Sequence, residues 1–415
     1  MSLPSLFSDL AARLQSPEFL LAARHPEHPT AFTRRRKLPL VSLVALMLSG
    51  MRKSVQAELD TFFAHLQQQA QLVRHVSEQA FAQARAKLST TAIPALNDWL
   101  IERAEFYGFV TRWRGLRLVA ADATSVRFGL RASRVTRAAL ADQIVFGLFL
   151  PGTELMLAAS LHSVRGNGER QMLFEHLDRL SCTDLLLLDR GYPASWLVAA
   201  LNQRQLPFCM RVDQTGYSCV QAFLRAGEAE QIVMLAPANR QDALDYGVER
   251  QRPTVRLVRS VSDTGQVRIL MTNLLDTERF PASVFGELYH HRWRIEEAFK
   301  RLKHRLNLEH VSGLSQQAVA QDVSAKVLCD NLQALTTHAA RKLAELPDNK
   351  RINHAYVHTV LKPLLPALLL GMKVDRLLQN VLRLVTRHTY RHRENQSKPR
   401  KATQKPHRSM TQKSC

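Results

Sequence analysis

The stretch YHHRWRIEEAFKRLKHRL, residues 289–306, lacks proline and glycine and predicts one uninterrupted helix. A helix turns by about 100° per residue, so residues spaced by three, four or seven positions share a face. One face is apolar and consists of Ile295, Phe299, Leu302 and Leu306. We expect this apolar face to pack against a core.

The same helix carries a second face, with charged and phenolic side chains. It consists of Tyr289, Arg292, Glu296 and Lys303, which lie within roughly 60° of one another on a regular helix. A carboxylate there could bind a hard divalent cation, and the two basic side chains could bind phosphate oxygens. Glu297 falls on the opposite side, so Glu296 is the better candidate for catalysis. The alternative is an amphipathic helix whose charged face only meets solvent.

The charge balance points to a polyanionic partner. The 415 residues include 57 Lys and Arg against 36 Asp and Glu, a net charge of +21. Nucleic acid is the usual partner of such a chain, and an acidic membrane surface is the alternative. The apolar runs at residues 40–48 and 364–370 are too short to cross a bilayer. Five cysteines without metal-ligand spacing, and the lack of a signal peptide, predict reduced thiols in a soluble cytoplasmic protein.

Helical patterns fill both ends of the chain. Residues 1–112 contain short amphipathic segments with Arg and Lys, which could enter a DNA groove or form an ordinary helical bundle. Residues 346–386 predict a C-terminal helical region. Residues 387–415 are rich in Lys, Arg, Ser, Gln and Pro, and they predict a basic disordered tail that either binds DNA or is merely solvated.

Between these regions the pattern changes to strands. Strands are predicted near residues 116–128, 144–150, 153–162, 184–192 and 207–212, with helices at 171–180 and 193–202. Pro151-Gly152 predicts a hairpin turn. This order indicates a mixed sheet with helices on its faces. Three further strands within residues 213–275 predict a small antiparallel insertion before the helix at 289–306.

Three acids stand out in this arrangement. Asp122 ends the first apolar run, Asp189 ends the fourth strand, and Glu296 lies on the helix. Ligands bind at strand ends in α/β sheets, although an Asp that caps the following turn is the common alternative. Three carboxylates together could hold two divalent cations, a clamp used for in-line displacement at phosphorus. Because all the ligands are hard oxygens, the expected metal is Mg²⁺.

These motifs resemble those of the DDE transposases of bacterial insertion sequences, of the insertion-sequence-four type. The family signature is Tyr, two residues, Arg, three residues, Glu, six residues and Lys, and residues 289–303 match it without a gap. The sequence DRGY at residues 189–192 matches the motif of the second Asp. The first-Asp motif is usually Asp-Gly-Thr, whereas this chain has Asp122-Ala123-Thr124. The resemblance covers about residues 116–332.

The resemblance implies a fold and a domain organisation. The fold class would be α/β, with a ribonuclease-H-like mixed sheet flanked by helices, interrupted by an antiparallel β insertion, and with helical N- and C-terminal regions. The catalytic domain would comprise residues 113–212 and 276–345, with the insertion at 213–275. The N-terminal helical domain at 1–112 would bind DNA.

The resemblance also implies residue roles. Asp122, Asp189 and Glu296 would bind two Mg²⁺ ions, for which Mn²⁺ could substitute, and would catalyse DNA cleavage. Contacts to DNA phosphates would come from Tyr289, Arg292 and Lys303, and Arg190, beside Asp189, is a further candidate. In related enzymes an aromatic side chain of the insertion receives a flipped base. Tyr217, Phe223 and Tyr246 are available here, although packing within the insertion is the preferred interpretation of each.

As a transposase, the protein would bind inverted terminal repeats, cleave at the ends of the element and join the freed 3′-hydroxyl to target DNA. It would act as a homodimer in a synaptic complex, near the nucleoid of a bacterial cell. Two alternatives remain. One is a stand-alone metal-dependent nuclease, and the other is a catalytically inactive, co-opted DNA-binding protein.

Overall fold

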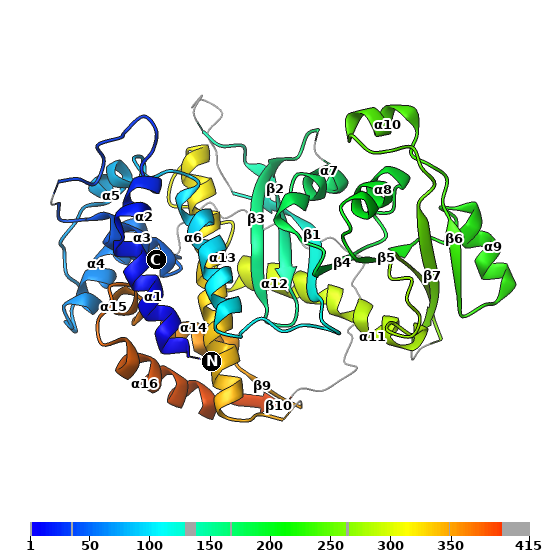
Figure 1. Ribbon diagram of the computed structural model, residues 1–415. Helices are drawn as coiled ribbons and strands as arrows, with labels where there is room; N and C mark the ends of the chain where they lie inside the picture. The colour runs from blue at the N-terminus through cyan, green and yellow to red at the C-terminus, as the bar shows by residue number, and fades with distance from the viewer. Residues whose placement is uncertain are drawn as a thin grey trace.

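Eight strands form one mixed sheet at the centre of the computed structural model, which describes residues 2–34, 36–128, 138–166, 168–262, 265–347 and 349–391 (Figure 1). Their bounds are β1 Arg117–Arg127, β2 Asp142–Leu150, β3 Leu155–Ser163, β4 Asp184–Leu188, β5 Phe208–Val212, β6 Glu230–Met234, β7 Thr254–Val261 and β8 Val267–Thr272. The order across the sheet is β3-β2-β1-β4-β5-β8-β7-β6. The pairs β1–β4 and β4–β5 are parallel, and the other neighbours are antiparallel.

This sheet confirms the predicted α/β class with a ribonuclease-H-like mixed sheet flanked by helices. The hairpin predicted at Pro151-Gly152 joins β2 to β3. The three strands predicted within residues 213–275 are antiparallel, and they extend the main sheet because β8 pairs with β5. Helices α9 (Ser218–Ala226) and α10 (Arg240–Asp245) accompany them at one end of the molecule (Figure 1).

Helices from both ends of the chain gather at the opposite end of the molecule (Figure 1). The N-terminal ones are α1 Leu3–Gln15, α2 Pro17–Ala22, α3 Leu40–Leu48, α4 Val55–Leu66, α5 Glu78–Arg85 and α6 Ala92–Phe106. The C-terminal ones are α13 Gln316–Leu343, α14 His354–Leu361, α15 Leu365–Leu369 and α16 Val374–Arg387. Helix α1 contacts α15 and α16, while α6 and α13 both pack on β3. The long α13 therefore connects the helical end of the molecule to the sheet.

The prediction of disorder from residue 387 onwards is wrong for residues 387–391, which adopt a defined structure. Residues Thr389–Arg391 form β10, which pairs with β9 (Lys350–Ile352) in antiparallel orientation. Residues 392–415 lie outside the described part of the chain. Within the described ranges, no helix has the length and apolar character needed to cross a membrane.

The stretch at residues 289–306 is not one uninterrupted helix, so this prediction is wrong. Helix α11 (Phe285–His290) is followed by the 3₁₀ turn His291–Trp293 and then by α12 (Arg294–His304). The residues at the junction keep right-handed helical backbone angles, while α11 packs against β7 and α12 against β1. The short 3₁₀ helix Ala282–Val284 precedes α11.

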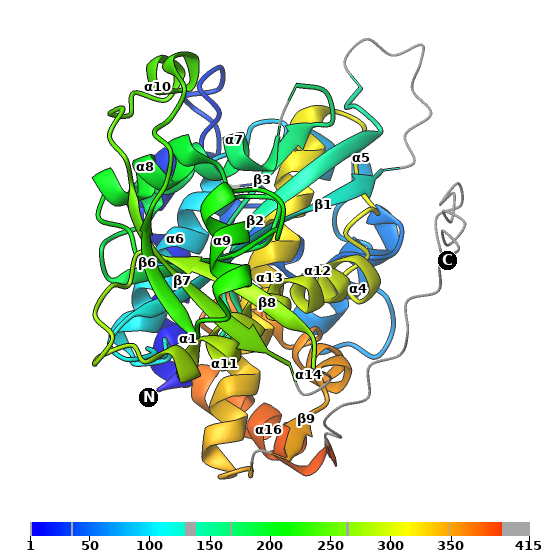
Figure 2. The ribbon, with the colours of Figure 1, turned by 90° about the vertical axis from the view of Figure 1, so that its right-hand side faces the viewer.

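The predicted apolar face is confirmed. The side chains of Ile295, Phe299, Leu302 and Leu306 are each at most 4% exposed. Helix α12 lies beside β1 and next to α13 (Figure 2). Between β3 and β4 the chain forms α7 (Glu169–Phe174), which contacts β1 and β2, and the 3₁₀ helix Leu177–Arg179. Helix α8 (Ser195–Gln203) joins β4 to β5.

Candidate functional site

A buried ion pair sets the register of the two strands that carry the predicted aspartates. Strand β1 pairs in parallel with β4, Arg117 opposite Asp184. The guanidinium of Arg117 donates to both carboxylate oxygens of Asp184, at 2.5 and 2.9 Å, and Asp184 is fully buried. Asp122 and Asp189 each lie five residues further along their strands. The parallel register therefore directs both aspartates to the same edge of the sheet.

Asp122 does not end its strand, which corrects the prediction from the apolar run. Strand β1 continues to Arg127 because its pairing with β2 extends from Ala120 to that residue. Only the pairing with β4 stops earlier, at Ala120. Asp122 therefore lies where β1 has passed the last paired residue of β4, beside an open edge.

A glycine lets α12 approach the face that carries Asp122. Asp122 lies directly opposite Gly147 of β2, and residues opposite each other in an antiparallel pair share a face. A Cβ atom at Gly147 would lie 3.1 Å from Cζ of Phe299 and 2.9 Å from Sδ of Met156. Because glycine has no Cβ, α12 can pack this closely. The helix thus brings Glu296 to the same side of the sheet as Asp122.

One buried guanidinium joins Asp122 and Glu296. Arg292 donates from Nη2 to Oε1 of Glu296 at 2.9 Å, and its Nη1 lies 3.9 Å from Oδ2 of Asp122. Its side chain is only 5% exposed, and its Nε has no hydrogen-bond partner among the described residues. Two of the three predicted carboxylates therefore lie beside the same guanidinium, that of Arg292.

Asp189 lies in the tight turn after β4. Its Oδ1 accepts a hydrogen bond of 2.7 Å from the backbone N–H of Gly191. Asp189 therefore caps the turn, as the alternative interpretation of this residue expects. The hydrogen bond uses Oδ1, so Oδ2 can accept from other partners. Asp189 also lies close enough to Asp122 to raise the pKa of that carboxyl group.

The electrostatics of the site indicate an excess of negative charge. The pKa of Asp122 is raised to about 7, mainly by burial. The N–H of Ala123 and the charge of Arg292 lower this pKa, and the charges of Glu169 and Asp189 raise it. The pKa of Glu169 is also raised, by burial and then by Asp189. Arg292 contacts Asp122 and Glu296 and acts electrostatically on Glu169, and Asp189 adds a further negative charge, so additional positive charge would stabilise these acids.

The residues predicted to contact DNA differ in accessibility. Tyr289 is 4% exposed, and burial raises its pKa to about 12. The ammonium group of Lys303 donates to the carbonyl oxygen of Ser125 at 2.5 Å. Arg190 is exposed, with its guanidinium 3.8 Å from the carboxylate of Asp213. Arg190 is therefore the most accessible of the four, and Tyr289 and Arg292 the least.

Sequence reasoning did not single out Glu169 or Tyr192. Glu169 is the first residue of α7, where an acidic side chain is ordinary because it complements the helix dipole. Tyr192 belongs to the DRGY motif, but the position of its hydroxyl depends on the fold and could not be predicted from the motif. Its side chain is fully buried, and the hydroxyl has no hydrogen-bond partner among the described residues.

The three aromatic side chains considered within residues 213–275 differ in their surroundings. Tyr246 stacks on Trp196, with ring centroids 3.6 Å apart and nearly parallel planes. Phe223 is fully buried, under the guanidinium of Arg259. Tyr217 is half-buried. The contact of Phe223 agrees with the preferred interpretation, which is packing within residues 213–275. Tyr246 packs instead on a helix outside those residues, which corrects that interpretation.

The donor set suits a hard divalent cation. Within the described ranges, no group of three or more His, Cys, Asp or Glu side chains is arranged to hold a metal ion. The chemistry of the donors nevertheless fits one, because carboxylate oxygens are the preferred ligands of Mg²⁺ and outnumber the available positive charges. The unpartnered Nε of Arg292 and hydroxyl of Tyr192 also leave hydrogen-bonding capacity at the site.

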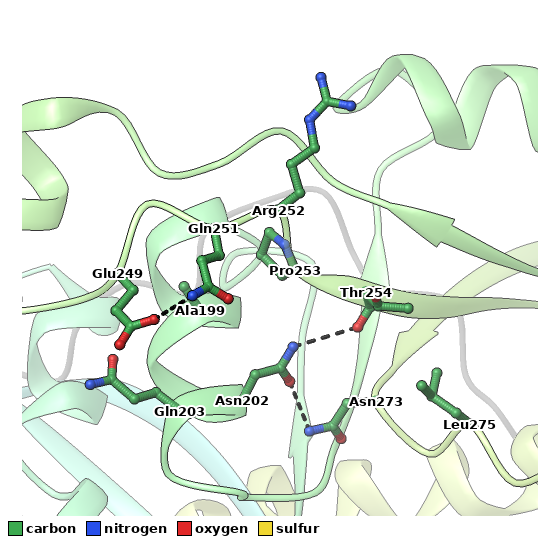
Figure 3. A pocket seen from close by; sticks show the side chains of 10 residues that line it. All are labelled: Ala199, Asn202, Gln203, Glu249, Gln251, Arg252, Pro253, Thr254, Asn273 and Leu275. Atoms are coloured by element: carbon green, nitrogen blue, oxygen red, sulfur yellow. Dashed lines mark hydrogen bonds between the residues drawn. The ribbon is translucent and has the colours of Figure 1, made fainter.

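A separate pocket of about 490 Å³ lies beside α8 and the start of β7, and none of the predicted site residues lines it (Figure 3). Its polar side chains bond mainly within the pocket. Asn273 donates to Asn202, which donates to the carbonyl oxygen of Thr254, and Gln251 donates to Glu249. These amides satisfy one another, so the pocket presents no chemistry related to the acids described above.

Comparisons with known proteins find a matching family model, a related sequence and a similar solved structure. Residues 113–332 match the family model described as transposase DDE domain. The chain is 24% identical over 323 residues to the transposase InsG for insertion sequence element IS4 of Escherichia coli strain K12, covering 74% of this chain and 71% of that protein. It also aligns with the cryo-EM structure of a piggyBac transposase synaptic complex with hairpin DNA, with a TM-score of 0.45 and 12% identity, over 92% of this chain and 85% of that one. The family match spans more than half of the 415 residues, and the protein therefore belongs to the DDE transposases.

Proposed function

We propose that this transposase cleaves DNA at the ends of its element and joins the freed 3′-hydroxyl to target DNA, using Asp122, Asp189 and Glu296. The observation that supports this proposal is the convergence of Asp122 and Glu296 on the guanidinium of Arg292, with Asp189 at the same edge of the sheet. These carboxylates come from β1, from the turn after β4 and from α12, which are far apart in sequence.

Divalent cations, Mg²⁺ with Mn²⁺ as a substitute, would be held by the carboxylates of Asp122, Asp189 and Glu296. When bound, such cations activate the attacking hydroxyl and stabilise the leaving oxygen in a displacement at phosphorus. The chain's own contribution is to fix the carboxylates in space. The hydrogen bonds from Ala123 and Gly191 orient the two aspartates, and Arg292 orients Glu296.

The four basic and phenolic residues would divide their roles by accessibility. Arg190 is exposed beside Asp189 and would contact a DNA phosphate directly. The ammonium group of Lys303, on α12, bonds to the carbonyl oxygen of Ser125 in β1 and would reach a phosphate after releasing it. Arg292 would first hold Asp122 and Glu296, and Tyr289 would support Arg292, whose guanidinium carbon lies 6.0 Å from the ring centroid.

The DNA partner is supported by the net charge of +21 and by the relative that is named for an insertion sequence element. Terminal inverted repeats and target DNA would be the two substrates. The helices within residues 1–112 would provide further DNA contacts, and residues 113–212 and 276–345 the catalytic domain. We also propose a homodimer in the synaptic complex and a location near the nucleoid.

A strand-transfer assay tests this function against a stand-alone nuclease. The substrate is a duplex that ends in the inverted repeat flanking the gene, already cleaved to expose the 3′-hydroxyl. With Mg²⁺ and target plasmid, the protein is expected to form a covalent joined product, and Asp189→Asn is expected to form none. Cleavage of the uncut duplex without any joined product would contradict the proposal and favour the nuclease. Neither cleavage nor joining by the wild-type protein would favour the inactive DNA-binding protein.

A further inference from the structure

A fourth acidic side chain lies against the turn that carries Asp189. Glu169 begins α7, and Arg170 beside it donates from Nε to the carbonyl oxygen of Gly191 at 2.9 Å. A Cβ atom at Gly191 would lie 3.0 Å from Oδ1 of Asp189 and 3.7 Å from Oε2 of Glu169. The absence of that Cβ leaves the two carboxylates as close neighbours. The hydrogen bond from Arg170 thus holds the start of α7 against the turn, and Glu169 lies near Asp189.

Within the described ranges, no hydrogen bond or ion pair joins the carboxylate of Glu169 to another residue. Arg292 acts on it only at a distance, and Asp189 repels it. An acid that merely complemented a helix dipole would gain nothing from lying beside a second carboxylate. Its location therefore calls for a positively charged or hydrogen-bonding ligand that is shared with Asp189.

The hydroxyl of Tyr192 points to the same place independently. Tyr192 is fully buried, its hydroxyl has no partner among the described residues, and the carboxylates that act on it are Glu169, Asp122 and Asp189. A phenol normally finds a hydrogen-bond partner when it is buried. Three carboxylates act on this hydroxyl electrostatically and none of them accepts a hydrogen bond from it, so it has a hydrogen bond to offer to a ligand.

We propose that Glu169 is a fourth carboxylate of the divalent-cation centre, and that the hydroxyl of Tyr192 donates a hydrogen bond to water or carboxylate bound there. This inference rests on the proposed function, because it assumes that Asp122 and Asp189 hold a cation. It adds a ligand from α7, an element that carries none of Asp122, Asp189 and Glu296. The centre would then take carboxylates from β1, from the turn after β4, from α12 and from α7.

Mn²⁺ binding to the full-length protein tests the role of Glu169, with free Mn²⁺ followed by electron paramagnetic resonance. Glu169→Gln keeps the shape of the side chain and removes its charge. We expect this variant to raise the Mn²⁺ dissociation constant by about 10- to 100-fold, the range seen when a residue that supports a metal site is removed. Glu175→Gln is the matched control, since it lies at the other end of α7 beside His162, and its dissociation constant should stay at the wild-type value.

The outcomes separate the two proposals. If Asp122→Asn weakens Mn²⁺ binding and Glu169→Gln does not, the fourth carboxylate is wrong and the proposed function stands. If neither variant changes the dissociation constant, both proposals fail. Thermal unfolding without cation verifies that the variants are folded. Glu169→Gln is expected to melt no lower than the wild type, because it relieves repulsion with Asp189.

Tyr192→Phe tests the hydroxyl alone. Because the hydroxyl has no partner in the described part of the chain, the variant is expected to unfold at the wild-type temperature when no cation is present. In the same resonance assay, its Mn²⁺ dissociation constant should rise several-fold, since one hydrogen bond to the bound shell is lost. An unchanged dissociation constant would overturn this part of the inference, while Glu169 is judged separately.

Discussion

Replacing Glu296 with Gln is expected to abolish DNA strand cleavage while the protein still folds and binds DNA. Gln keeps an oxygen and the side-chain length but removes the charge that a divalent cation needs. Loss of one preorganised electrostatic group in an active site costs about 10²–10³ in rate, and a lost metal ligand should cost at least that much. The measurement is the rate at which a labelled duplex carrying the inverted repeat is nicked in Mg²⁺.

The neighbouring residue supplies the control for this prediction. Glu297 has a side chain that is 61% exposed, and its carboxylate lies 3.8 Å from the guanidinium of Arg294. Glu297→Gln should therefore nick at nearly the wild-type rate. Binding of the duplex in Ca²⁺ should be retained by both variants. A Glu296→Gln protein that nicks as fast as Glu297→Gln would remove Glu296 from the catalytic set.

Replacing Arg117 with Met is expected to destabilise the fold by about 3–5 kcal/mol, because it leaves the charge of Asp184 buried without its partner. Arg117 is the partner that donates to both oxygens of Asp184, which is fully buried. The pair also fixes the register that aligns Asp122 with Asp189. Urea unfolding, followed by circular dichroism, measures the change in the free energy of unfolding.

A double variant separates the buried charge from the loss of packing. Replacing Asp184 with Leu as well as Arg117 with Met removes both charges, and apolar replacements of buried ion pairs are often neutral or stabilising. The double variant should therefore recover most of the stability lost in the single one. If Arg117→Met unfolds at the same urea concentration as the wild type, Asp184 does not depend on that ion pair.

The apolar face of α12 could be predicted because it follows from local helical spacing. The choice of Asp122, Asp189 and Glu296 follows from motif spacing, and their roles stay a prediction. Ile295 and Phe299 are buried as their helical spacing requires. The break at His291–Trp293 could not be predicted, since it depends on which strands the two helical halves meet. The pairing of β8 with β5 is likewise a long-range contact that no local signal reports.

The role of Arg292 escaped prediction for a different reason. On a helix drawn alone, its side chain lies beside Glu296 and looks free to bind phosphate. In the fold, packing against β1 buries it and brings it near Asp122 as well. Glu169 was missed because an acid at the first position of a helix has an ordinary explanation. Only the proximity of its carboxylate to Asp189 distinguishes it.

The shared cation site is tested most directly by a crystal structure of the full-length transposase with Mn²⁺ and terminal-repeat DNA, in which anomalous scattering locates the metal. The account predicts Mn²⁺ with oxygens of Asp122, Asp189 and Glu296 within about 2–2.5 Å. Mn²⁺ bound elsewhere, or a DNA-bound structure in which one of these three carboxylates stays too far away to share an ion with the others, would contradict it.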